Sequence, residues 1–305
     1  MDEQSSQTPE SSSVTLVPPD HSRQFSTLLP VGETLRLGWE LYRSKASLAA
    51  QIMALPFILF FVGSVAGIAA AFGSVALGDI VGKPVGVVLL GLVVITAVFL
   101  AFITAFLAQI SIATIFVTDT TQTEVRDLYR SSWKLLGRYA MFMLIMSVIS
   151  IGTYGLFIIP GFVLNIFFCF ASFVVIAEGK RGMEALMTSY AYVSGYFLPI
   201  AIRLIAVVAY IFPFLIVSVG IERVFALVNL RSLGMFVSNI ISSLVMTPLT
   251  VAYLAVIYRN IRSMKGQVAP AWEKKQIVIM LTILGYILLP AMLFGLFGLA
   301  IFGSA

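Results

Sequence analysis

Long runs of apolar residues, separated by short charged segments, dominate the pattern of this sequence. No Asp, Glu, Lys or Arg occurs in residues 46–78, 85–118 or 139–177. A helix needs about 20 apolar residues to cross a hydrocarbon core of roughly 30 Å. Each of the three runs is longer than that. The pattern therefore predicts an all-α integral membrane protein.

Seven spans are predicted, at residues 46–72, 85–117, 139–158, 160–177, 197–220, 234–257 and 277–302. The run 139–177 is divided in two because a single helix of that length would measure about 58 Å, about twice the hydrocarbon thickness. Gly152, Gly155 and the pair Pro160-Gly161 lie near its middle and favour a tight hairpin. A re-entrant segment is the alternative interpretation.

The distribution of basic residues predicts the orientation of these spans. With seven spans and a cytoplasmic N-terminus, 15 of the 19 Lys and Arg residues lie on the cytoplasmic side and three outside, with Arg203 inside a span. Treating 139–177 as one span gives ten inside and eight outside. Because membrane proteins carry an excess of Lys and Arg on the cytoplasmic side, the seven-span topology is favoured, with the C-terminus outside.

Amphipathic segments precede three of the spans and indicate a repeated architecture. In residues 124–138 the apolar face follows the helical spacing i, i+3, i+4, i+7 and comprises Val125, Leu128, Tyr129, Ser132, Trp133 and Leu136. Similar faces occur in residues 33–43 and 183–193. We expect three units of an amphipathic helix plus a transmembrane hairpin, followed by one C-terminal helix. Such segments usually lie in the interfacial plane, so Trp133 is predicted at the membrane surface.

Composition divides the chain into three parts and limits the classes of partner that we expect it to bind. Residues 1–28 are polar and predict a disordered cytoplasmic tail, 29–265 form the polytopic domain, and 266–305 contain a linker and the extra helix. Only 11% of residues are charged, and the formal net charge is +5. We therefore expect anionic lipid headgroups as partners on the cytoplasmic side, and possible membrane-protein partners, but no nucleic acid.

Residue types that carry catalysis or bind metals are scarce. The chain has one histidine, His21, in the predicted tail, and one cysteine, Cys169, so no metal, cofactor or His-based catalytic site is expected. Arg203 is the one charged residue within a predicted span, which makes it a candidate functional residue. The favoured interpretation is that Arg203 snorkels to the headgroups. A structural partner, such as Asn165 or Gln109, and contact with a substrate are the alternatives.

Short motifs in the second half of the chain resemble a known family. They are Ile159-Pro160-Gly161, Glu178-Gly179-Lys180, Glu184-Ala185-Leu186, Ser189-Tyr190 and Tyr258-Arg259-Asn260-Ile261-Arg262. Over roughly residues 30–265 the chain resembles the membrane domain associated with some bacterial glycerophosphodiester phosphodiesterases and its free-standing relatives. The resemblance implies a polytopic membrane module without the phosphodiesterase activity, which belongs to a separate soluble barrel. It makes Glu178 and Tyr190 candidate functional residues.

These observations lead to two functional hypotheses. The first is a non-enzymatic multi-pass protein of the cell membrane that organises lipid or a partner protein. The second is a transporter or channel for a small or amphipathic solute. Intramembrane acids for ion coupling are missing from the predicted spans, which disfavours proton coupling. Pro199 and Pro213 in the fifth span and Pro248 in the sixth are the features that favour transport.

Overall fold

The computed structural model of the chain describes residues 27–81, 83–118, 124–156 and 158–302, and this part is helical without a β-strand. The predicted tail, apart from its last two residues, lies outside the described residues. The long helices are α1 (Val31–Val81), α2 (Lys83–Val117), α3 (Val125–Leu156), α7 (Phe197–Leu227), α9 (Thr247–Lys265) and α10 (Lys275–Phe302). Between them lie α4 (Ile158–Phe168), α5 (Ala171–Ala177), α6 (Gly182–Val193), α8 (Arg231–Ile241), a π-helical segment (Ser242–Met246) and a 3₁₀ turn (Trp272–Lys274).

Within the described residues, six helical segments are candidate membrane spans by their length and apolar composition. They are Val31–Gly73, Pro84–Val117, Val125–Leu156, Ile158–Ala177, Phe197–Leu227 and Arg231–Lys265. Six of the seven predicted spans thus have a counterpart, and the run 139–177 is divided between two of them. The seventh, 277–302, falls on α10, whose side chains from residue 291 onward lie outside the described part. The count of seven therefore stays a prediction.

The first two amphipathic segments differ from the predicted repeat. Residues 33–43 are the beginning of α1, and residues 125–136 are the beginning of α3, with no break before the apolar part of either helix. Helical hydrogen bonding continues through both junctions, in α3 across Gly137. Only the third segment forms a separate helix, α6. It ends at Ser194-Gly195, where Gly195 has a φ of +83° that a side chain would strain.

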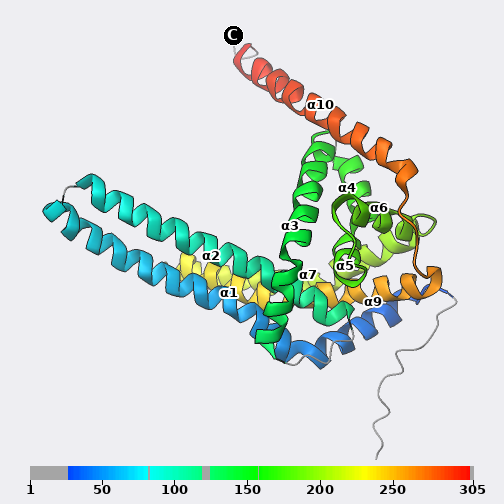
Figure 1. Cartoon of the computed structure of the whole chain (residues 1–305), viewed down its shortest axis with the longest axis horizontal. Coiled ribbons are helices and arrows are strands. Elements are labelled where there is room, and N and C mark those ends of the chain that lie inside the picture. The colour runs from blue at the N-terminus through cyan, green and yellow to red at the C-terminus, as the bar shows by residue number, and fades with distance from the viewer. Residues whose placement is uncertain (1–26, 82, 119–123, 157, 303–305) are drawn as a thin grey trace, which may run out of the picture.

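The buried core lies at one end of the molecule, where the C-terminal half of α2 meets α5, α6 and α9. Fully buried side chains there include Phe116, Phe170, Leu186 and Tyr258. From this core α1 and α2 extend together as a long antiparallel hairpin, while α3 leads in a different direction and its C-terminal end crosses α10 (Figure 1). At 1.5 Å per residue α1 is about 76 Å long. The helices therefore diverge from the core instead of closing into one bundle.

Candidate functional site

The carboxylate of Glu178 is the centre of a buried polar network at the end of α5. Its side chain is 4% exposed, and Oε1 accepts hydrogen bonds from the hydroxyls of Tyr192 (2.7 Å) and Tyr258 (2.8 Å). Oε2 lies 3.2 Å from Lys180 Nζ. A buried carboxylate is costly unless its oxygens are paired. Here both oxygens have partners, so the network stabilises the negative charge.

Three helices place these groups around Glu178. Glu178 directly follows α5, Tyr192 lies near the end of α6, and Tyr258 lies in α9, 80 residues along the chain from the carboxylate it binds. The two tyrosine rings meet edge to face with centroids 5.7 Å apart. Burial raises the pKa of Tyr192, and the hydrogen bond and negative charge of Glu178 raise it further. Tyr192 therefore acts as a neutral hydrogen-bond donor.

The same network holds the linker that follows α9. Lys180 Nζ donates to Val268 O and to Thr188 Oγ1, both at 3.1 Å, and the Tyr192 hydroxyl also lies 3.2 Å from Gly266 O. Further along, the amide of Ala271 donates to Met187 O at 3.2 Å. The chain between α9 and α10 is thus attached to α6, which fixes where α10 begins.

A groove lies between α4 and α10, next to this attachment. It has a volume of about 360 Å³ and is lined by Ile159, Pro160, Val163, Leu164, Phe167, Tyr190, Lys274, Ile277, Val278 and Leu281. Lys274 directly precedes α10, and the ring of Tyr190 stacks on Phe167 near the C-terminal end of α4 with centroids 4.3 Å apart. Lys274 therefore lies where the linker meets the groove, and the lining is apolar apart from its amine and the Tyr190 phenol.

Ser189 and Tyr190, which carry the family resemblance, brace the junction between α4 and α5. Ser189 Oγ donates to Phe167 O (2.8 Å) and accepts from the amide of Phe170 (3.2 Å), so it pairs backbone groups where the helix is interrupted. The Tyr190 ring stacks on the side chain of Phe167, and both residues line the groove. Of the two candidate residues predicted from the motifs, Glu178 is the centre of the buried polar network and Tyr190 lines the groove. Helix α6 contributes residues to both.

Arg203 is buried in the structure, which differs from the predicted snorkelling to the headgroups. The residue is only 8% exposed. Its Nη1 donates to Pro199 O at 2.7 Å, and its Nη2 donates to Leu29 O. The amide of Leu29 in turn donates to Asn260 Oδ1 at 3.1 Å. Arg203 and Asn260 thus clamp the segment before α1. The alternative partner Asn165 donates instead to the hydroxyl of Tyr154.

Trp133 lies on the surface of α3, which is an unbroken helix from Val125 to Leu156. Its side chain is 58% exposed, but two members of its stripe, Leu128 and Ser132, are fully buried. Ser132 is hydrogen bonded to Ser111 of α2, and the Tyr129 hydroxyl donates to Ile52 O. The stripe therefore packs mainly against α1 and α2, so the separate interfacial helix expected for residues 125–136 is not what forms.

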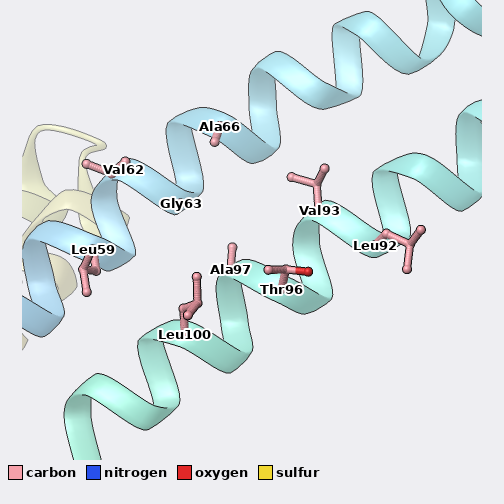
Figure 2. Close-up of a pocket in the computed structure, with 9 residues that line it drawn as sticks. All are labelled: Leu59, Val62, Gly63, Ala66, Leu92, Val93, Thr96, Ala97 and Leu100. Carbon is pink, nitrogen blue, oxygen red and sulfur yellow. The ribbon is translucent and has the colours of Figure 1, made fainter. Parts of the chain in front are cut away.

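A second groove lies between α1 and α2 in the part of the hairpin beyond the core (Figure 2). It has a volume of about 400 Å³ and is lined by Leu59, Val62, Gly63, Ala66, Leu92, Val93, Thr96, Ala97 and Leu100. A Cβ added to Gly63 would lie 3.1 Å from that of Ala97, so the helices are in contact at this point. The lining is apolar apart from the Thr96 hydroxyl.

Sequence reasoning did not predict that Tyr192 and Tyr258 bind Glu178, nor that Arg203 and Asn260 both bind Leu29. These contacts join different segments of the chain, and no local pattern indicates them, whereas Lys180 lies in the same short motif as Glu178. The one available signal is a carboxylate directly after an apolar run, because such a group needs donors nearby if it is buried. Among the described residues no group of three or more His, Cys, Asp and Glu could hold a metal ion.

The fold defines a multi-pass helical membrane protein. No protein-family model matches the chain, and neither a curated protein nor a solved structure matches it. The resemblance to the phosphodiesterase-associated membrane domain therefore depends on the short motifs alone and stays a prediction.

Proposed function

We propose that this protein is a non-enzymatic module of the cell membrane that organises lipid, or a partner helix, around its exposed helices. The observation that carries the proposal is the α1–α2 hairpin, which extends away from the core (Figure 1). Large apolar side chains cover it, among them Phe61 (60% exposed), Ile68 (60%) and Phe99 (61%). Exposed apolar surface on this scale is typical of membrane or partner contact.

The proposed topology places the N-terminus in the cytoplasm and the C-terminus outside. The 15-to-three distribution of basic residues supports it. On this orientation the Glu178 network and the linker 266–271 lie on the cytoplasmic side, where anionic lipids give the membrane surface a negative potential. The basic residues near these segments would then face the lipids that attract them.

Photocrosslinking from the hairpin tests the proposed function. A photoreactive benzophenone side chain would replace Phe61 in the hairpin and, as the matched control, the fully buried Phe116. We expect irradiated cells to yield phospholipid adducts, or one discrete protein adduct, at position 61 and neither at position 116. Lipid adducts would identify lipid as the occupant and a protein adduct a partner helix. The absence of both at position 61 would contradict the proposal.

The alternative function, transport of a small or amphipathic solute, is favoured by one structural observation. The span Arg231–Lys265 is interrupted by the π-helical segment Ser242–Met246, and Ser242 is hydrogen bonded to Ser218 of α7 at 3.0 Å. Such interruptions often occur at functional sites. Purified protein in sealed vesicles that accelerates solute release, with loss of this activity in Ser242→Ala, would favour transport over the module that we propose.

A further inference from the structure

The groove between α4 and α10 combines an apolar wall with a single cationic residue. Val163, Leu164 and Leu281 contribute to the wall, Tyr190 adds a phenol, and Lys274 lies where the linker enters α10. Lys274 is half-buried, and none of the ion pairs found in the described part of the chain uses its amine. The groove is thus shaped for a ligand with an apolar tail and an anionic head.

The dimensions and surroundings match a membrane lipid. From Lys274 to Leu281 α10 rises about 10 Å, which is two-thirds of the roughly 15 Å hydrocarbon depth of one leaflet. Trp272, 47% exposed, lies just before Lys274, and tryptophan is enriched where hydrocarbon meets headgroups. Lys274 therefore lies near the depth at which a phospholipid carries its phosphate.

The neighbouring charges favour an anionic headgroup over a zwitterionic one. Lys274 and Lys275 are consecutive, and Glu273 is the one acid in the segment 270–276. Lys275 is directed elsewhere, with its amine 5.5 Å from the centroid of the Trp272 ring. Lys274 thus supplies the charge at the groove, and Lys275 provides a matched lysine outside it.

We infer that this groove is a binding site for an anionic phospholipid, with an acyl chain between α4 and α10 and the phosphate at Lys274. The inference rests on the proposed function, because it names the lipid class and one place where it binds. The Glu178 network contributes by holding the linker, so that Lys274 stays at the groove.

Fluorescence quenching of Trp272 tests the site. A variant carrying Trp39→Phe and Trp133→Phe, with Trp272 as its one tryptophan, would be reconstituted in phosphatidylcholine vesicles containing a minor fraction of phosphatidylglycerol. Bromine, a quencher, is placed on the acyl chains of one lipid or the other. The ratio of the two quenching efficiencies, corrected for mole fraction, gives the local enrichment of phosphatidylglycerol.

We expect Lys274→Gln to lower this enrichment about fivefold, because one lysine near an anionic surface contributes about 1 kcal/mol. Lys274→Arg should retain it, Lys275→Gln should have a much smaller effect than Lys274→Gln, and Val163→Phe, which fills the groove without changing charge, should also lower it. Equal losses in Lys274→Gln and Lys275→Gln would show only general surface attraction and overturn the site. So would a loss in Lys274→Arg, an unchanged enrichment in Val163→Phe, or no enrichment at all.

The two proposals fail in different experiments. Photocrosslinking at position 61 reports on the hairpin, and quenching of Trp272 reports on the groove at the opposite side of the core. Lipid adducts at position 61 together with no enrichment at Trp272 would support the proposed membrane module and contradict only the specific lipid site.

Discussion

Gly152 of α3 and Gly285 of α10 pack backbone against backbone where the two helices cross. A Cβ added to Gly152 would lie 2.6 Å from Thr282 O, and one added to Gly285 would collide with Gly152 O. Gly152, which the sequence suggested as a helix-breaking residue, is instead inside α3 and allows this approach. Small residues at membrane helix contacts commonly have this role.

The crossing gives a first prediction. Gly285→Ala should force α10 away from α3 and lower the free energy of unfolding by about 1–3 kcal/mol, the usual cost of overpacking. Gly91→Ala is the matched control, because nothing lies within 4 Å of its added Cβ, and it should be neutral or slightly stabilising. Thermal unfolding in detergent measures both. Equal melting temperatures in the two variants would argue against the crossing.

The Glu178 network gives a second prediction. Glu178→Gln leaves Lys180 without its carboxylate partner and changes an acceptor of two tyrosine hydroxyls, so we expect a loss of roughly 2–4 kcal/mol. The control is Glu40→Gln, whose carboxylate lies 3.6 Å from Arg36 on the surface and should contribute less than about 1 kcal/mol. Limited proteolysis should cut the linker 266–271 faster in Glu178→Gln. An unchanged cleavage rate would contradict the role assigned to the network.

Arg203 gives a third prediction, which differs from the expectation for a snorkelling side chain. Because the guanidinium donates to two backbone carbonyls, both Arg203→Leu and Arg203→Lys should reduce stability, Leu by about 1–3 kcal/mol and Lys by less. The exposed Arg223 supplies the control, and Arg223→Gln should have little effect. Thermal unfolding of the purified variants decides the matter. If Arg203→Leu left the stability unchanged, the result would favour the snorkelling interpretation.

The proposed topology gives a fourth prediction. After replacement of Cys169, a cysteine at the exposed position Ser263, just before the end of α9, should resist a membrane-impermeant thiol reagent in intact cells and react once the membrane is opened. A cysteine at Arg223, assigned to the outer side, should react in both conditions. Labelling at Ser263 in intact cells would reverse the orientation.

Hydropathy alone predicted the helical class, because spanning helices leave uninterrupted apolar runs. The division of the single run 139–177 was predicted from its length, from the glycines and proline near its middle, and from the distribution of basic residues. The amphipathic segments at the beginning of α1 and α3 were harder to interpret, since an interfacial helix and the first turns of a longer helix share one pattern of side chains. The stripe around Trp133 shows the difference: its partners Ser111 and Ile52 belong to other helices. The hydrogen bond from Tyr258 to Glu178 depends on tertiary packing and left no local signal.

The clamp on Leu29 also has a consequence for biosynthesis. The Leu29 amide binds Asn260, which lies 231 residues downstream. The start of the first helix therefore cannot form its final contacts until α9 has left the ribosome. At 5–20 residues per second that interval is on the order of 10–50 s. During this time the backbone around Leu29 lacks its final partners, and a chain whose translation stops before α9 never acquires them. The amino-terminal end of the folded domain is thus among the last parts to mature.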